Sequence, residues 1–382
     1  MNIIAFYLPQ FHAIPENDKA WGEGFTEWVN VKKATPLFEG HQQPKIPLNK
    51  NYYNLLDINV MKWQVEMAKK YGVSGFCFYH YWFNRKLLLE KPLEQFRDTP
   101  DIDMPYCLCW ANEPWSKTWV SKENDVIMPQ KYGDEDEWVD HFNYFLPFFN
   151  DQRYMKKNNK PFVVIYRPSD IPCLEAMLEC WRDLAVKNGF NGLEIAFQTM
   201  NFDMENDKRR ALFDYDIEYQ PQYAEMDLDK LNIPWLRKVK RKIDKVLLGR
   251  KGGKTIDFHE MIYKKRIKTN NMMSYEKLWN AILKRKPIDN KCIPGAFVNW
   301  DNSPRKGINA RICEGANPAT FKKYLSEQIK HAREVYHKDQ IFIYAWNEWA
   351  EGGYLEPDEY NRYGYLEAIS DALKENNEWP FK

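Results

Sequence analysis

The chain has 382 residues, and its 55 Lys and Arg nearly balance its 54 Asp and Glu. A net charge this close to zero argues against a protein that binds nucleic acid through its overall field, so we expect no nucleic-acid partner. Aromatic residues make up 16% of the chain, including 15 Trp, and two uses fit such an excess: a large aromatic core, or a cleft that stacks on sugar rings.

Targeting and metal-binding signatures are missing from the sequence. The apolar run at the N-terminus has no basic region before it and stops at Pro9, which does not fit a signal peptide. No stretch reaches the roughly 18 apolar residues of a membrane span. The seven Cys are scattered without a CxxC pair, as in a reduced chain without structural zinc. We therefore expect a cytoplasmic location.

Short apolar runs rich in β-branched and aromatic residues predict eight strands. In chain order these are 3–7, 73–79, 104–109, 162–166, 193–197, 214–219, 296–300 and 341–346. Segments of helical period separate most of them: one starts at Asp57 and stops before Gly72, and another begins with Asn317 as cap and Pro318 in the first turn. Eight such units favour an α/β fold, a single (β/α)8 TIM barrel over residues 1–382, rather than a doubly wound sheet.

Two regions interrupt this alternation. The first is a long loop after strand one, residues 12–57, which is rich in Gly, Pro and aromatic residues. The second, residues 234–291 between strands six and seven, carries 18 Lys and Arg against five Asp and Glu and is predicted to be a basic, mostly helical insertion. Its segment 235–254 either lies on the barrel as a solvated helix or binds an anionic membrane surface or a lipid-linked glycan, peripheral to the inner membrane.

In a TIM barrel the C-terminal strand ends and the loops after them carry the chemistry. Nearly every predicted end here pairs an aromatic residue with a carboxylate, an amide or His. Aromatic rings stack on sugar faces and polar side chains bond to hydroxyls, so we expect an oligosaccharide or polysaccharide substrate. The predicted substrate-binding residues are Tyr7, His12, Glu27, Trp28, Tyr79, His80, Trp110, Asn112, Glu113, Trp115, Tyr166, Trp300, Asp301, Trp346 and Asn347.

Two carboxylates beyond the last strand are predicted to be catalytic. Cleavage of a glycosidic bond commonly uses one acid to protonate the leaving oxygen and a second to supply or generate the nucleophile. Glu348 and Glu351 are three residues apart, and in a turning loop both can face the barrel axis. Asn112 and Asn347 each precede a Glu, an arrangement that can fix a sugar hydroxyl beside the acid.

The sequence contains no well-placed motif for nucleotide binding, for a serine hydrolase or for metal binding. There is no GxGxxG, GxxxxGK[ST] or GxSxG motif, and the scattered His12, His41 and His80 offer no metal-ligand spacing. Residues 101–103 match DxD, but they precede strand three and so lie on the opposite face of the barrel. We therefore expect neither a metal nor a cofactor.

Five motifs resemble those of WbsX-type proteins. They are residues 6–12 (FYLPQFH), 24–28 (GFTEW), 75–82 (GFCFYHYW), 110–113 (WANE) and 346–352 (WNEWAEG). WbsX-type proteins are bacterial chains often described as glycosyltransferases of O-antigen or capsule clusters, and also as similar to family 99 of the glycoside hydrolases, the endo-α-mannosidases. The resemblance to the WbsX group spans nearly the whole chain, whereas the resemblance to the mannosidases rests on the barrel and the segment after strand eight.

The mannosidase resemblance implies roles for two residues. Glu348 matches the carboxylate that deprotonates the sugar's own 2-hydroxyl, and Glu351 matches the acid/base that protonates the leaving oxygen. The implied activity is cleavage or transfer of α-linked glycans, mannosyl glycans among them, with retained configuration. The family pattern has His where this chain has Ala350. Two alternatives stay open: a glycosyltransferase of O-antigen or capsular polysaccharide biosynthesis, and a non-catalytic glycan-binding protein.

Overall fold

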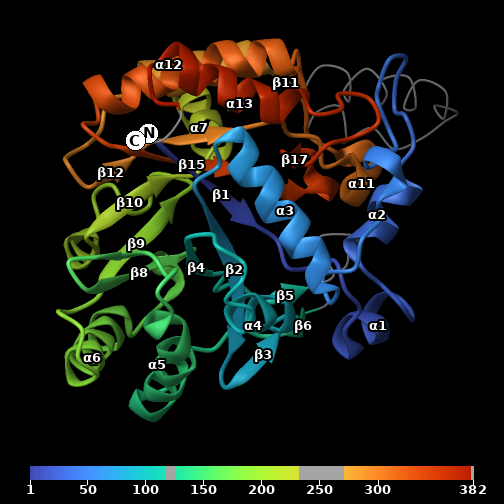
Figure 1. The fold of residues 1–382 in the computed structure, drawn as a ribbon. Coiled ribbons are helices and arrows are strands. Elements are labelled where there is room, and N and C mark those ends of the chain that lie inside the picture. Colours follow the sequence, from blue (N-terminus) through green and yellow to red (C-terminus); the bar gives the residue numbers. More distant parts are fainter. Residues whose placement is uncertain (117–125, 232–270, 380–382) are drawn as a thin grey trace, which may run out of the picture.

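The computed structural model describes residues 1–116, 126–231 and 271–379, and its centre is a ring of parallel strands (Figure 1). The pairing order around the ring is β12-β10-β9-β8-β4-β2-β1-β15-β13. These strands are β1 (Asn2–Tyr7), β2 (Gly75–Phe83), β4 (Tyr106–Trp110), β8 (Lys160–Ile165), β9 (Glu194–Thr199), β10 (Tyr215–Glu218), β12 (Cys292–Ile293), β13 (Gly295–Phe297) and β15 (Gln340–Tyr344).

The ring closes through a seventh strand that is interrupted at Pro294. The half before Pro294, β12, pairs with β10, and the half after it, β13, pairs with β15. Gly295 packs tightly at this point: a Cβ on it would lie 1.7 Å from the Glu218 carbonyl oxygen. With β12 and β13 counted as one strand, all eight predicted strands are present and the predicted (β/α)8 barrel is confirmed.

Helices follow most strands and surround the ring (Figure 1). Helix α3 begins one residue after the predicted start, with the Asp57 side chain as its cap, and Gly72 ends it with φ 93°, as predicted. Asn317 and Thr320 form a capping box at the start of α12. The helices are α3 (Ile58–Tyr71), α4 (Lys91–Arg97), α5 (Glu135–Asn150), α6 (Leu174–Lys187), α7 (Gln222–Leu231), α10 (Tyr275–Lys284), α12 (Pro318–Glu334) and α13 (Gly364–Glu375).

Residues 12–57 contain more regular structure than the predicted loop. Two short helices form here, α1 (Pro15–Trp21) with Pro in its first turn and α2 (Glu27–Lys33) capped by the Thr26 side chain. A 3-10 turn, η1 (Leu48–Lys50), follows them. Local capping signals therefore outweigh the Gly and Pro content that favoured a loop.

Short elements extend the strand ends into loops. The loop after β13 contains α11 (Ser303–Lys306) and η5 (Gly307–Asn309), and the loop after β15 contains β16 (Asn347–Glu348), η6 (Trp349–Glu351) and β17 (Gly353–Tyr354). The remaining short elements are β3 (Lys86–Leu88), β5 (Trp115–Ser116), β6 (Val126–Met128), β7 (Lys156–Lys157), β11 (Met272–Ser274), β14 (Ile312–Glu314), η3 (Pro168–Asp170) and η4 (Lys208–Leu212).

Most of the basic region 234–291 lies outside the described residues, including the segment 235–254 that is predicted to be a basic helix. The described remainder supplies α10, which buries Leu278, Trp279 and Ile282 and contacts α7 and α12. Across the described ranges, no helix combines the length and apolar character needed to cross a membrane. Membrane binding by this region stays a prediction.

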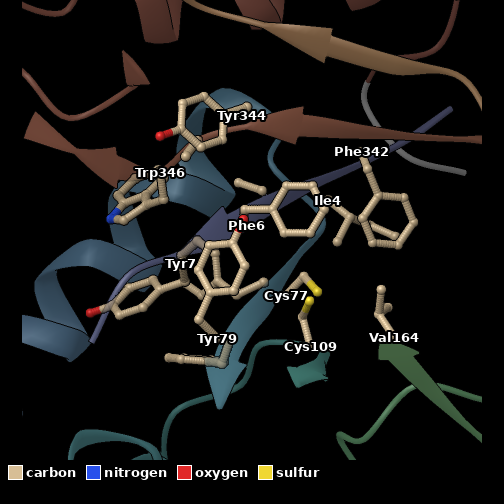
Figure 2. Close-up of a cluster of buried hydrophobic side chains, with 14 of the residues drawn as sticks. Ile4, Phe6, Tyr7, Cys77, Tyr79, Cys109, Val164, Phe342, Tyr344 and Trp346 are labelled. Carbon is tan, nitrogen blue, oxygen red and sulfur yellow. The ribbon is translucent and has the colours of Figure 1, made fainter. Parts of the chain in front are cut away.

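The barrel interior is rich in aromatic residues. Figure 2 shows Phe6 and Tyr79 among the side chains that fill it, and their rings stack with centroids 5.6 Å apart. Several Trp are also almost fully buried: Trp110, Trp181, Trp279, Trp346 and Trp349. A large share of the aromatic excess therefore belongs to the core.

Candidate active site

The loop after β15 turns back on itself and presents two carboxylates. Glu348 in β16 pairs with Gly353 in β17, and η6 joins the two strands. Gly352 ends η6 with φ 68°, and a Cβ there would lie 2.9 Å from the Asp301 backbone nitrogen, so the turn requires glycine. Because the chain turns, Glu348 and Glu351 line the same pocket at the C-terminal ends of the barrel strands.

Both carboxylates bond to one buried arginine. Arg305 donates from Nη1 to Glu351 Oε1 at 2.6 Å, and its Nη2 lies 3.5 Å from Glu348 Oε2. A third carboxylate, Glu27 in α2, accepts from Arg305 Nε at 3.1 Å. The Arg305 side chain is only 6% exposed. This three-carboxylate cluster joins α2, α11 and the loop after β15 around a single guanidinium.

Burial gives Glu348 an unusual affinity for protons. Desolvation raises the pKa of Glu348 well above its ordinary value; Arg305 opposes the rise, and Glu351 and Glu27 add to it. The Glu348 side chain is 7% exposed and that of Glu351 is 20% exposed. Glu351 also accepts a hydrogen bond from the Tyr344 hydroxyl. A carboxylate with a raised pKa is a stronger base than an ordinary glutamate, which suits proton abstraction.

Two asparagines tie neighbouring strand ends together in the same way. Asn347 accepts from the Leu8 backbone nitrogen at 2.8 Å and donates to the Leu8 carbonyl at 3.0 Å. Asn112 makes the same two bonds with the backbone of Arg167, at 2.7 and 2.8 Å. Each Asn therefore bonds to backbone rather than facing the pocket, and it fixes the start of the segment that carries the next acid.

The second of those acids, Glu113, lies in the same pocket. Its carboxylate pairs with Arg167 Nη2 at 3.1 Å. Burial raises the pKa of Glu113, while Arg167 lowers it and Glu351 raises it further. The pocket therefore contains two acid–arginine groups, one around Arg305 and one around Arg167.

The pocket has a cavity volume of about 230 Å³. Six predicted site residues line it: Tyr79, Glu113, Tyr166, Trp300, Glu348 and Glu351. The lining that sequence reasoning missed comprises Leu8, Gln10, Tyr81, Ala111, Arg167, Tyr219, Gln222, Asn302, Arg305, Lys306 and Tyr344. Gln10 and Asn302 closely follow predicted strands and Tyr219 ends one, so position could have identified them, whereas no pattern marks Arg305.

The other predicted site residues are buried behind this lining. The indole N–H groups of Trp28 and Trp110 donate to the backbone carbonyls of Tyr53 and Trp82 at 2.8 and 3.2 Å. The full set is Tyr7, His12, Glu27, Trp28, His80, Trp110, Asn112, Trp115, Asp301, Trp346 and Asn347.

His80, Asp301 and Trp115 also have polar side-chain partners within the protein. His80 Nε2 lies 2.9 Å from His141 Nε2, and burial lowers the pKa of His80 to about 3. Asp301 accepts from Gln43 Nε2 at 2.6 Å, and Trp115 donates to Asn17 at 3.1 Å. Within the described ranges, no group of three His, Cys, Asp or Glu side chains is placed to hold a metal ion.

The fold is similar to those of two solved carbohydrate-related structures. A glycoside hydrolase-like protein aligns with a TM-score of 0.56 and 15% identity over 97% of this chain and 93% of that chain. The GH99 endo-alpha-mannosidase from Bacteroides thetaiotaomicron aligns with a TM-score of 0.55 and 14% identity over 98% of this chain and 97% of that chain. At these identities the likeness concerns the fold alone.

Sequence relatives are found in Xanthomonas campestris pv. campestris. Two proteins described as uncharacterized protein WxcX, from strains ATCC 33913 and B100, are 33% and 34% identical over 373 residues, which is 97% of this chain and 49% of theirs. The chain thus spans about half the length of these curated relatives. The family model described as glycosyltransferase WbsX matches residues 3–369. The chain therefore belongs to the WbsX glycosyltransferase family.

Proposed function

We propose that this chain is a carbohydrate-active enzyme that cleaves or transfers α-linked glycans, mannosyl glycans among them, by a retaining mechanism with 2-hydroxyl participation. The observation that carries the proposal is the pair Glu348 and Glu351, both bonded to Arg305 in one pocket at the strand ends. Burying such a charged cluster costs free energy that folding alone does not require. Tyr79, Tyr166 and Trp300 supply aromatic surface around it.

The two acids differ in ways that suit different steps. Glu348, the more buried, takes the proton of the 2-hydroxyl, and that oxygen attacks the anomeric carbon to form a 1,2-anhydro sugar. Glu351, the more exposed, gives its proton to the leaving oxygen as the glycosidic bond breaks. In the second step Glu351 removes a proton from the incoming hydroxyl, the anhydro ring opens, and Glu348 returns its proton to O2. Two inversions give net retention.

The incoming hydroxyl decides between hydrolysis and transfer. Water gives hydrolysis, whereas a sugar hydroxyl gives transfer by the same residues. Membership of the WbsX family favours transfer in polysaccharide biosynthesis as the second candidate function. The third candidate, a non-catalytic glycan-binding protein, needs neither Glu348 nor its raised pKa.

The test is turnover of α-linked manno-oligosaccharides and O-antigen oligosaccharides, with and without nucleotide sugars. Glu348→Gln and Glu351→Gln are each expected to lower kcat/KM at least about a hundredfold, because each removes a proton-transfer group. Glu367→Gln, at an exposed position of α13, is the control. Undiminished turnover in both pocket variants contradicts the assignment, turnover only with nucleotide sugars identifies a nucleotide-dependent transferase, and binding without turnover identifies a binding protein.

A further inference from the structure

A second pocket adjoins the first at the next strand end. Residues that follow β8, the C-terminal part of β9 and the segment after it, and the start of α7 line it. Tyr166, Arg167 and Gln222 line both pockets, so the two share one wall. Arg167 is fixed in that wall by the Asn112 side chain, which bonds to its backbone, and by Glu113 at 3.1 Å.

The second pocket has buried polar atoms that are not bonded to protein. Gln198 and Thr199, the last two residues of β9, are 2% and 6% exposed. Gln198 Oε1, Thr199 Oγ1 and Arg167 Nε find no hydrogen-bond partner in the described part of the chain. An unpaired buried polar atom costs free energy, so these atoms in one pocket wall point to a ligand that pairs with them.

The unpaired atoms suit the hydroxyls of a neutral sugar. Gln198 Oε1 accepts, Arg167 Nε donates, and the Thr199 hydroxyl does either. Phe197 and Met204 add apolar surface for the C–H face of a ring. An anionic ligand fits poorly, because the Arg167 charge is already paired with Glu113.

We infer that the second pocket is a subsite for a sugar residue adjacent to the one held at Glu348 and Glu351, so that the protein engages at least two consecutive sugars of one glycan. The inference deepens the proposed function and rests on it, since the first pocket supplies the reaction. It predicts a preference for longer glycans over single glycosides.

Binding and turnover are measured separately to test the subsite. Calorimetry on Glu351→Gln protein gives the Kd of mannose and of α-linked manno-oligosaccharides of two to four residues, and kinetics on protein with Glu351 intact gives kcat/KM for the same sugars. Thr199→Val, which removes one hydroxyl at nearly constant volume, and Gln198→Met, which removes the acceptor, are introduced into both backgrounds. Thr35→Val, at an exposed position outside both pockets, is the control.

Extension by the residue that enters the second pocket is expected to tighten binding about tenfold. Thr199→Val and Gln198→Met are each expected to remove most of that gain, whereas Thr35→Val preserves it. Thr199→Val should leave the shorter sugar unaffected; Gln198→Met also removes the 3.5 Å contact of Gln198 with Tyr79 in the first pocket, so its effect is judged on the gain alone. Turnover without any length preference, or a preference unchanged in both variants, overturns the subsite but leaves the proposed reaction intact. Length-dependent binding that both variants abolish, without turnover in intact protein, overturns the reaction but supports the subsite. No binding of any of these sugars overturns both.

Discussion

Arg305 shares one positive charge among three carboxylates, and this sharing sets the protonation of the pocket. Its guanidinium bonds to Glu27 and Glu351 and lies 3.5 Å from Glu348, so its strongest bonds are not with the proposed base. Glu348 thus keeps a raised pKa in spite of a buried cation beside it. A closer pairing would lower the basicity that proton abstraction from a sugar hydroxyl needs.

Replacement of Arg305 by Gln is expected to shift the pH profile upward. Glu348 acts as a base only when ionised, so kcat/KM falls as the pH drops through its pKa. Burial places this acidic limb above that of an ordinary glutamate, and loss of the Arg305 charge raises the pKa further. We expect the limb to move to higher pH and kcat/KM at neutral pH to fall roughly tenfold or more. Arg362→Gln, at an exposed site, is the control. If the acidic limb of the Arg305→Gln profile stays at the same pH or moves to lower pH, Arg305 does not set the pKa of Glu348 in this way.

At the scale of elements, the buried carboxylate of Glu356 anchors the β16–β17 hairpin through hydrogen bonds. Glu356 accepts from the indole N–H of Trp346 at 3.1 Å and of Trp349 at 2.6 Å, on either side of Glu348. It also accepts from Gln64 in α3 at 2.6 Å and from Tyr53 at 2.8 Å. The catalytic loop, the segment before α3 and α3 itself therefore meet at one side chain.

Glu356 is expected to make stability depend on pH. Burial raises its pKa to about 7, against about 4.3 in an unfolded chain, so the folded state holds the proton more tightly. The stabilisation is complete below about pH 4 and is lost as the pH rises through about 7, a change of roughly 4 kcal/mol. Urea unfolding should show this change in the difference between the native protein and Glu356→Gln. A difference that stays constant between about pH 4 and pH 8, as for the exposed control Glu367→Gln, would refute it.

The two hydrogen bonds between the Asn347 side chain and the Leu8 backbone, here called the Asn347 clamp, are expected to support both stability and catalysis. Asn347→Ala removes both bonds to Leu8 and leaves two buried backbone groups unpaired, so we expect a loss of roughly 2–4 kcal/mol in the free energy of unfolding. The kcat should fall as Glu348 loses its fixed position. Asn112→Ala breaks the matching clamp beside Glu113 and serves as the comparison. Unchanged unfolding and unchanged kcat in Asn347→Ala would show that the clamp is dispensable.

The sequence predicts strands and caps well but not which way a strand-end side chain points. Helix α3 begins within one residue of the predicted start and ends at Gly72 as predicted, because the signals at helix ends are local. Trp300 and Trp346 each end a predicted strand beside a polar residue, yet Trp300 lines the pocket and Trp346 is buried against Glu356. Their directions depend on tertiary loop paths. Arg305 was missed for the same reason, since α2 and the last loop have to fold before its partners are defined.

At the scale of the whole molecule, barrel closure depends on the tight packing at the interrupted seventh strand. Gly295→Ala would place a methyl group 1.7 Å from the Glu218 carbonyl oxygen, so strands β10 and β13 would have to separate. We expect a loss of several kcal/mol, roughly 3 or more, measured by thermal or urea unfolding. Gly24→Ala is the control, because its φ is 74° but nothing lies within 4 Å of an added Cβ. Equal losses in the two variants would show that crowding at Gly295 is unimportant.

The central claim is that Glu348 and Glu351 act on one anomeric centre. The most direct measurement is a crystal structure of Glu351→Gln with a bound α-linked manno-oligosaccharide. We predict that the Glu348 carboxylate lies within about 2.6–3.2 Å of the sugar 2-hydroxyl and that the residue-351 side chain lies within the same reach of the glycosidic oxygen. A sugar bound in this pocket with its anomeric carbon beyond the reach of both side chains would contradict the account.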